Sequence, residues 1–92
     1  MIISFKHRGL RRFYERDDKS GIGANMRNRV QEILTVLDAA ETLDDLDVPG
    51  YRLHPLTGNR RGTWTIRVTG NWRITFRFED GGAHDVDLED YH

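Results

Sequence analysis

Residues 63–78 read TWTIRVTGNWRITFRF, and they give the strongest indication of the fold of the chain. Apolar and polar side chains alternate on both sides of the central Gly70–Asn71 pair, which is the pattern of two half-buried antiparallel strands. We expect a three-residue loop over 69–71, because it puts the apolar residues of both strands on one face, whereas a two-residue turn would mix apolar and charged residues. The three-residue loop predicts three cross-strand pairs: Val68 with Trp72, Ile66 with Ile74 and Trp64 with Phe76.

A third strand is indicated by the same alternation at residues 84–88, where apolar side chains again take every second position. A five-residue loop over 79–83 returns this strand to the second one. The cross-strand pairs expected from that loop are Phe78 with His84, Phe76 with Val86 and Ile74 with Leu88. His84 is then expected on the apolar face, as a packing histidine. The three strands predict a small antiparallel meander.

The N-terminal half predicts helices that cover the apolar face of this sheet. Residues 2–5 indicate a short opening strand, and residues 7–15 a short amphipathic helix with a basic face. Asn25 is expected to cap a longer helix, and residues 43–46 to add one helical turn before Pro49–Gly50. The apolar stripe of the long helix consists of Met26, Val30, Ile33, Leu34, Leu37 and Ala40. The predicted fold class is α+β, with two N-terminal helices packed on one face of a small antiparallel β-sheet.

The length of 92 residues indicates a single domain, residues 1–92, with one modest core. The chain has no cysteine, which excludes a disulfide framework and a thiolate zinc site. No apolar run approaches the roughly 18 residues of a membrane span, and the N-terminus becomes charged too early for a secretory signal. We therefore expect a soluble cytoplasmic domain with no membrane partner.

The net charge of −1 conceals a strong segregation of charge along the chain. Residues 1–30 carry +5, residues 31–50 carry −6, residues 51–78 carry +6 and residues 79–92 carry −6. Segregated charge builds surface patches, and a basic patch is the electrostatic signature of a phosphate-rich partner. The alternative is that neighbouring blocks pair across the fold and cancel one another. Charge alone leaves both interpretations open.

Two arginines meet on the polar face of the predicted hairpin, because its register sets Arg67 opposite Arg73. Like charges in directly opposed positions destabilise a sheet, but two adjacent guanidinium groups match the oxygens of a phosphate. The alternative is structural: Glu89 on the third strand would neutralise Arg73, just as Asp85 would pair with Arg77. The polar face is therefore a candidate anion site.

Histidines accompany these arginines in two places. His54 stands in the loop YRLHPLTGNRRG, residues 51–62, and the sequence closes with Asp90-Tyr91-His92. Imidazole, carboxylate and phenol groups can take a proton from a ribose 2′-hydroxyl and give one to the leaving 5′-oxygen, while arginine stabilises the charge at phosphorus. No metal and no other cofactor is expected, because HExxH and His-x-His spacings are absent. These groups are suited to RNA cleavage.

Several segments together resemble HigB-type toxins of the RelE/ParE superfamily of bacterial toxin–antitoxin modules. The main ones are residues 50–64, GYRLHPLTGNRRGTW, residues 68–76, VTGNWRITF, and residues 87–92, DLEDYH. Residues 4–10, SFKHRGL, and the Asp44-Asp45-Leu46 segment also fit, so the resemblance covers nearly the whole chain. The combination of Gly-Asn-Trp-Arg with a terminal Asp-Tyr-His is specific.

The resemblance implies a RelE-like fold and a ribosome-dependent mRNA endonuclease that cuts messages in the decoding site of the small subunit without a metal. It also implies a HigA-type helix-turn-helix antitoxin as partner, through which the toxin–antitoxin complex would bind operator DNA. Thr57 stands where the family often has a lysine, so that lysine's role is absent or moved. The family's catalytic positions match His54, Asp90, Tyr91 and His92, with Arg73 as the phosphate contact. The expected RNA or ribosome contacts are Lys6, Arg8, Arg11, Arg12, Arg60, Arg61 and Arg67.

It stays open which of His54, Asp90 and His92 acts as acid and which as base. Two alternative functions of the chain also stay open. ParE-like members of the same superfamily would poison DNA gyrase by binding, without cutting RNA. A non-catalytic nucleic-acid or protein-binding module would carry the histidines incidentally. His54 and the Asp90-Tyr91-His92 ending favour the nuclease, because a pure binding protein has no need of them.

Overall fold

The computed structural model describes residues 1–91, and the structural statements that follow concern that part of the chain. The helical elements are α1 (Arg8–Arg16), the 3₁₀ turn η1 (Ala24–Met26), α2 (Arg27–Ala39) and the 3₁₀ turn η2 (Leu43–Leu46). Strand β1 (His54–Pro55) and the 3₁₀ turn η3 (Gly58–Arg60) come next, followed by β2 (Thr63–Thr69), β3 (Trp72–Glu79) and β4 (Gly82–Asp90). The short helix predicted at 7–15 and the helical turn predicted at 43–46 are present as α1 and η2.

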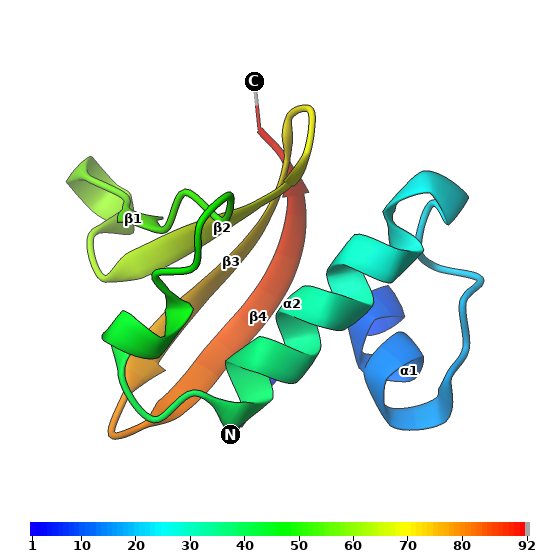
Figure 1. Ribbon diagram of the computed structural model, residues 1–92, viewed down its shortest axis with the longest axis horizontal. Helices are drawn as coiled ribbons and strands as arrows, with labels where there is room; N and C mark the ends of the chain where they lie inside the picture. The colour runs from blue at the N-terminus through cyan, green and yellow to red at the C-terminus, as the bar shows by residue number, and fades with distance from the viewer. Residues whose placement is uncertain (92) are drawn as a thin grey trace.

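The elements form two layers, a sheet and a pair of helices (Figure 1). The strand order is β1-β2-β3-β4, and every neighbouring pair is antiparallel. Helix α2 contacts both β2 and β4, and α1, on the far side of α2 in the view of Figure 1, also contacts β4. The predicted α+β architecture is therefore confirmed. Within residues 1–91, no helix is long and apolar enough to cross a membrane.

The core lies between α2 and the covered face of the sheet. Along α2 the buried residues are Val30, Ile33, Leu34 and Leu37, and Met26 and Ala40 are buried at its two ends. The sheet contributes Ile66, Ile74, Phe76, Val86 and Leu88. The buried positions of α2 recur every three or four residues, so they line a single face of the helix. Because each buried side chain of this size contributes about 1.5–3 kcal/mol, this stripe holds the helix on the sheet, as predicted.

The β2–β3 hairpin keeps its predicted face but closes with a tighter turn. The pairs Ile66–Ile74, Trp64–Phe76 and Arg67–Arg73 are all present. The expected pair of Val68 with Trp72 is wrong, because Trp72 pairs with Thr69. Gly70, at a φ of 54°, opens a two-residue turn in a conformation that glycine adopts without strain. Val68 becomes the extra residue of a β-bulge and stays buried, so the bulge preserves the apolar face.

The five-residue loop predicted over 79–83 is wrong as well. Asp80 and Gly81 have φ values of 51° and 74°, and positive φ at both central residues is the mark of a type I′ turn. Phe78 therefore pairs with Ala83 instead of with His84, the expected partner. An Asp-Gly pair between two alternating stretches is among the strongest hairpin signals, so the sequence did contain this information.

A second bulge moves His84 to the polar face. Asp85, at a φ of 54°, is the extra residue on β4, and beyond it the ladder returns to the expected pair Ile74–Leu88. On the near side of the bulge His84 pairs with Arg77. The prediction that His84 packs on the apolar face is therefore wrong. The expected proximity of Asp85 and Arg77 is confirmed, with 3.9 Å between their charged groups.

The N-terminal segment lies along the outer edge of β4 without forming a regular strand. Ile2 bridges to Ala83 and Phe5 bridges to Val86, both in the parallel sense. The N–H of Lys6 donates to the carbonyl oxygen of Val86 at 2.8 Å. The predicted opening strand is thus reduced to isolated bridges, which nevertheless bring Lys6 to the rim of the sheet.

The two helices begin in different ways. His7 caps α1, since its Nδ1 accepts from the N–H of Leu10 at 3.0 Å. Asn25 does not cap α2 as predicted, because it lies inside η1, and Met26 takes the N-cap position without a side-chain hydrogen bond. The N–H of Met26 donates instead to the carbonyl oxygen of Gly23 at 2.9 Å. A 3₁₀ turn therefore takes the place of a side-chain cap.

Candidate active site

The sheet face opposite the helices, here called the open face, carries polar side chains in rows. His54 of β1 pairs with Thr65 of β2, and Thr65 pairs with Thr75 of β3. The next row towards the β2–β3 turn holds Arg67 and Arg73. Positions two apart on a strand point to the same side and lie about 7 Å apart. The open face therefore places His54 one row away from the paired arginines.

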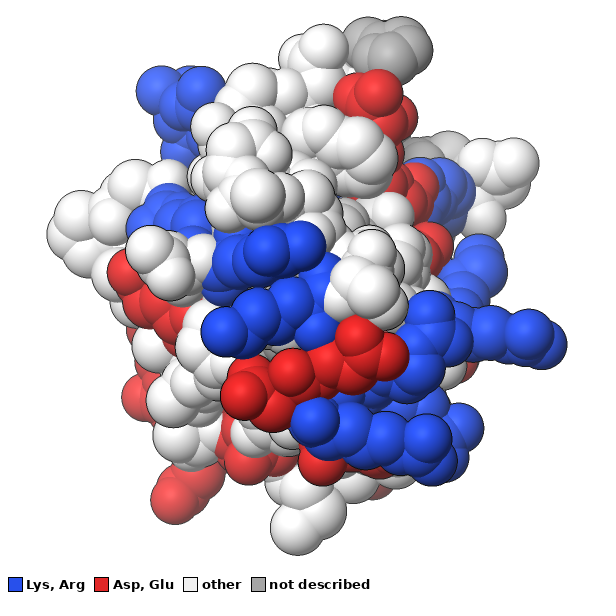
Figure 2. Space-filling view, turned by 90° about the vertical axis from the view of Figure 1, so that its right-hand side faces the viewer, with Lys and Arg blue, Asp and Glu red and all other residues white. Residues whose placement is uncertain are grey.

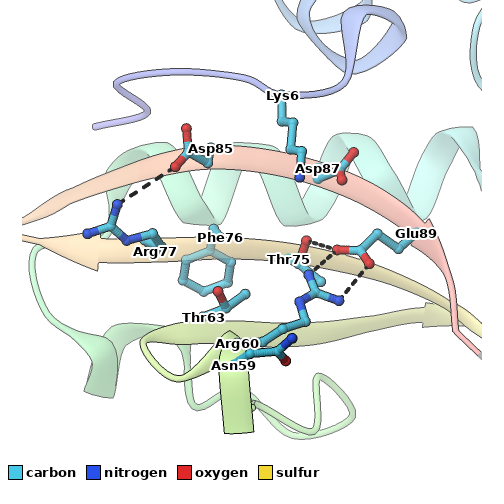
Figure 3. A pocket seen from close by; sticks show the side chains of 10 residues that line it. All are labelled: Lys6, Asn59, Arg60, Thr63, Thr75, Phe76, Arg77, Asp85, Asp87 and Glu89. Atoms are coloured by element: carbon cyan, nitrogen blue, oxygen red, sulfur yellow. Dashed lines mark hydrogen bonds and ion pairs between the residues drawn. The ribbon is translucent and has the colours of Figure 1, made fainter. Parts of the chain in front are cut away.

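An ion pair crosses the open face from η3 to β4 (Figure 3). Nη1 and Nη2 of Arg60 donate to Oε1 and Oε2 of Glu89 at 2.9 and 2.6 Å. The hydroxyl of Thr75 donates to Oε2 of the same carboxylate at 2.5 Å. These hydrogen bonds, that of Arg60 first, hold the pKa of Glu89 below its usual value, and the same pair raises the pKa of Arg60. Glu89 is therefore ionised at neutral pH and tied to Arg60.

Glu89 does not neutralise Arg73, although the two residues pair in register. Nη1 of Arg73 donates to the carbonyl oxygens of Gly70 at 2.9 Å and of Trp72 at 3.1 Å. The interpretation in which Glu89 holds Arg73 is therefore wrong. The physical reason is that Arg60 reaches the carboxylate from outside the β3–β4 ladder with both arms of its guanidinium.

Two threonines beneath the ion pair are buried although they face the open side. Thr65 is 1% exposed and Thr75 is 2% exposed. Thr75 is bound by Glu89, and the hydroxyl of Thr65 lies 3.3 Å from Nδ1 of His54. Within residues 1–91, no buried side-chain nitrogen or oxygen lacks a hydrogen-bond partner. Sequence reasoning missed both threonines, and the only signal for them was the strand parity that they share with the paired arginines.

The backbone before His54 fixes the tautomer of its ring. Nδ1 lies 2.8 Å from the carbonyl oxygen of Arg52, and a carbonyl oxygen only accepts, so Nδ1 carries the proton of the neutral ring. Nε2 then has a lone pair, with the hydroxyl of Thr65 at 3.4 Å. Arg52 itself takes a left-handed φ of 52°, which a non-glycine residue seldom adopts. The exposed ring of His54 therefore presents a basic nitrogen on the open face.

A buried tyrosine anchors the segment that leads to His54. The hydroxyl of Tyr51 donates to Glu32 of α2 at 2.7 Å, and the guanidinium of Arg29 lies 4.8 Å from the ring centroid. Burial and the bond to Glu32 raise the pKa of Tyr51 to about 12. The N–H of Arg67 donates to the carbonyl oxygen of Tyr51 at 2.8 Å. Helix α2 and strand β2 thereby fix the start of the segment that carries His54.

His54 and Tyr91 line one hollow of about 290 Å³, although they lie far apart in the sequence. The full lining is His54, Pro55, Leu56, Thr57, Asn59, Arg60 and Tyr91. The N–H of Tyr91 donates to the carbonyl oxygen of Asn71 at 2.7 Å, and Asp90 pairs in register with Trp72. The tertiary structure thus brings two of the predicted catalytic residues together. His92 lies outside the described residues.

A second hollow, of about 420 Å³, is lined by both residues of the ion pair (Figure 3). Arg60 and Asn59 line both hollows, so the two hollows adjoin at η3. Lys6 points into the second hollow from the N-terminal segment, towards Asp87 (Figure 3). Three of its lining residues are acidic, yet among residues 1–91 no three or more His, Cys, Asp or Glu side chains are arranged to hold a metal ion.

The remaining predicted RNA contacts lie chiefly on α1. The side chains that gather there are Arg8, Arg11, Arg12, Glu15 and Arg16. Figure 2 shows this face, with lysine and arginine side chains crowded around acidic ones. Arg11 pairs with Glu15 at 3.1 Å and Arg12 with Asp18 at 3.5 Å. The charged blocks of the sequence therefore cancel only in part, and α1 keeps a basic surface.

The chain matches the family model of the "RelE-like toxin of type II toxin-antitoxin system HigB" over residues 3–92. It is 45% identical over 92 residues to Endoribonuclease HigB of Proteus vulgaris, with both chains covered completely. It is 36% identical over 91 residues to Toxin HigB-1 of Vibrio cholerae, covering 97% of this chain and 96% of that one. The crystal structure of a YafQ mutant from E. coli shares the fold, with a TM-score of 0.62 and 16% identity, covering 98% of this chain and 93% of that one.

These matches extend over the whole chain, as the resemblance read from residues 50–64, 68–76 and 87–92 did. Both curated relatives carry the HigB name, which excludes the ParE-like alternative. The chain belongs to the HigB-like family of RelE-like toxins of type II toxin–antitoxin systems.

Proposed function

We propose that this chain is an endoribonuclease toxin that cuts mRNA on the ribosome, in the decoding site of the small subunit, and so inhibits translation. The observation that carries the proposal is the hollow where His54 and Tyr91 meet, one row from the paired arginines Arg67 and Arg73. The identity of 45% to Endoribonuclease HigB over the whole chain supports the RNA-cleaving activity.

In the cleavage step the phosphoryl group passes from the 5′-oxygen to the neighbouring 2′-oxygen. Nε2 of His54 takes the proton of the 2′-hydroxyl, because the bond from Nδ1 to Arg52 leaves the lone pair on Nε2. The 2′-oxygen bonds to phosphorus, the bond from phosphorus to the 5′-oxygen breaks, and a group of the C-terminal segment 90–92 gives the 5′-oxygen its proton. The products are a 2′,3′-cyclic phosphate and a 5′-hydroxyl. Protein groups take up and supply the protons that the reaction moves.

Arg73 stabilises the negative charge that builds up on the phosphoryl oxygens. Its two hydrogen bonds to backbone carbonyls both use Nη1, and they hold the guanidinium beside the β2–β3 turn. Nη2 and Nε can then donate to phosphate oxygens. Arg67, directly opposite on β2, adds a second positive charge to the same row. Stabilisation of this kind is often the largest single contribution to catalysis.

The ribosome supplies what the open face lacks. The hollow at His54 is small, and few groups line it, so the chain alone orients RNA poorly. A message in the decoding site is already positioned, which provides the proximity that the reaction needs. The basic surface of α1, Lys6, Arg61 and Arg67 would contact the phosphates of ribosomal RNA or of the message.

Membership of a type II toxin–antitoxin family means that the chain has an antitoxin partner. We propose a HigA-type protein with a helix-turn-helix, through which the complex would bind operator DNA. Because the substrate is translated mRNA, the place of action is the cytoplasm. A small helix-turn-helix protein encoded in the neighbouring reading frame, co-purifying with this chain, is the expected finding.

The function is tested by mapping cleavage of one mRNA, either free or on translating ribosomes, with His54→Ala as the inactive control. We expect cuts in the ribosome-bound message, hardly any in free RNA, and none with the variant. Comparable cleavage of free RNA would contradict the dependence on the ribosome. Intact message under both conditions would contradict the nuclease itself.

A further inference from the structure

We infer that the Arg60–Glu89 ion pair is a positioning device for RNA cleavage, which holds the segment 54–61 and the C-terminal end of β4 at the separation that the reaction needs. The inference rests on the function proposed above. Both residues act through the groups that they hold, without touching the reacting atoms. Arg60 accordingly tethers η3 to β4. This role differs from the RNA contact that the sequence suggested for Arg60.

The pair joins two walls of the hollow that no backbone ladder within residues 1–91 joins directly. Segment 54–61 is bound to β2, where the N–H of Leu56 donates to the carbonyl oxygen of Thr63 at 2.8 Å. Tyr91 follows β4, which lies on the other side of β3 in the sheet order. Arg60 spans this distance to Glu89, which stands two residues before Tyr91 (Figure 3). The ion pair therefore sets how far apart the two walls lie.

Glu89 is also connected to His54 through the buried threonines. The carboxylate accepts the hydroxyl of Thr75, and Thr75 pairs in register with Thr65. The hydroxyl of Thr65 lies 3.3 and 3.4 Å from the two ring nitrogens of His54. Removal of Glu89 leaves the buried hydroxyl of Thr75 without its acceptor, so the floor beneath the histidine has to rearrange.

Charge also argues for a tether. Both arms of the Arg60 guanidinium are engaged by one carboxylate, and the side chains of Arg60 and Glu89 are only 40% and 24% exposed. An RNA phosphate that recruited Arg60 would have to displace Glu89 and would then face its negative charge. While the pair is intact, Glu89 is neutralised and does not repel the substrate beside it.

The experiment uses Arg60→Ala, Glu89→Ala, the double variant and the nearly isosteric Glu89→Gln. Ribosome-bound mRNA cleavage is measured at a fixed toxin concentration as a function of the concentration of mRNA-programmed ribosomes, which separates kcat from KM. Both alanine variants should lower kcat by about 10- to 100-fold, since small displacements of reacting groups cost rates of this order. KM and its dependence on salt should not change. The double variant should be no worse than either single variant, because the pair is lost as a unit. Glu89→Gln should recover part of the rate, because an amide oxygen can still accept from Arg60.

The matched control is the ion pair of Arg77 with Glu79, which lies on the same sheet at the other end of β3. Arg77→Ala and Glu79→Ala should keep the parental kcat. Backbone amide exchange gives a readout that does not depend on activity. The amides of Leu56 and Arg61 should exchange faster in both Arg60→Ala and Glu89→Ala, whereas the amide of Tyr51, bound to Val48, should not change.

The outcomes separate the inference from the proposed function. Parental kcat in Glu89→Ala would overturn the tether. A raised KM with a shallower salt dependence in Arg60→Ala alone would make Arg60 an RNA contact and would also overturn it. If the alanine variants do not fold, Glu89→Gln decides: a lowered kcat at unchanged KM supports the tether, and a parental kcat refutes it. A parent chain that cuts no ribosome-bound mRNA would contradict the proposed function and the tether together.

Discussion

Arg73 lies opposite Glu89 in the β3–β4 ladder, but its guanidinium turns away and donates to the carbonyl oxygen of Gly70 at 2.9 Å. The carboxylate of Glu89 is bound by Arg60 instead. The positive charge of Arg73 is therefore not cancelled by the acid directly across from it. Within residues 1–91 the guanidinium of Arg73 is held by backbone carbonyls, and on this polar face it is well placed for a phosphate.

Replacing Arg73 with alanine should reduce ribosome-dependent cleavage by on the order of 10²-fold or more, the effect of losing one donor that stabilises the transition state. The unfolding midpoint should change little, because the two hydrogen bonds lost go to the carbonyl oxygens of Gly70 in the turn and Trp72 at the start of β3. Cleavage assays and thermal circular dichroism check the two statements. Arg73→Lys, which keeps the charge without the planar fork, should fall between parent and alanine variant. An unfolded alanine variant would indicate a structural role.

Loss of the chain's candidate proton carriers should abolish toxicity with little loss of folding. The variants are His54→Ala, Asp90→Ala, Tyr91→Ala and a deletion of His92. The C-terminal residues follow Leu88, the last core-facing position of β4, so they contribute little to stability. Growth inhibition and ribosome-bound mRNA cleavage are measured for each, with circular dichroism as the folding control. Full activity of the His92 deletion would remove His92 from the mechanism, and full activity of all four would leave the nuclease without a site.

The basic surface of α1 should act through charge alone. Arg8→Ala should weaken ribosome binding and reduce the slope of log affinity against log salt by about one, because one phosphate contact is lost. The cleavage rate at saturating toxin should stay parental. A filter-binding titration at several salt concentrations measures the ribosome affinity and its salt slope, and a cleavage assay measures the rate. Lys19→Ala, in the loop after α1 and at a different hollow, is the matched control and should bind like the parent. An unchanged salt slope in Arg8→Ala would exclude this surface as an RNA contact.

Acid should destabilise the fold partly through Glu89. Its pKa lies below the ordinary 4.5, first because Arg60 donates to it. A group with a lowered pKa in the folded state stabilises the protein above its ordinary pKa, and this contribution disappears as the pH falls through the lowered value. Glu89→Gln should therefore lose less stability than the parent between neutral pH and about pH 3. Thermal unfolding over that range measures the difference.

Asp38→Asn provides a parallel test of the acid prediction. The N–H of Ile2 donates to Asp38 at 2.8 Å and lowers its pKa, so this variant should also show a weaker dependence on acid. If the unfolding midpoints of both variants fall with pH as steeply as that of the parent, the assignment of the acid sensitivity to these carboxylates is contradicted.

Local patterns in the sequence predict the fold class and the chemical character of the two sheet faces. Alternation over residues 63–78 put Ile66 opposite Ile74 and Arg67 opposite Arg73, and the helical stripe of α2 supplied the cover. These features are local, because strand parity and helical spacing depend only on neighbours along the chain. The paired arginines could therefore be predicted, whereas the two-residue turn at Gly70–Asn71 was not, because the bulge at Val68 interrupts the alternation.

Contacts between remote segments determine which partner each charged side chain takes. Sequence parity offered Arg73 to Glu89, but the carboxylate binds Arg60, which the turn of η3 brings across two strands. The bulge at Asp85 likewise moved His84 to the polar face, since one extra residue reverses strand parity. The choice of ion-pair partner depends on distances between segments that are remote in the chain. Composition and periodicity do not predict those distances. The meeting of His54 with Tyr91 in one hollow is a product of folding for the same reason.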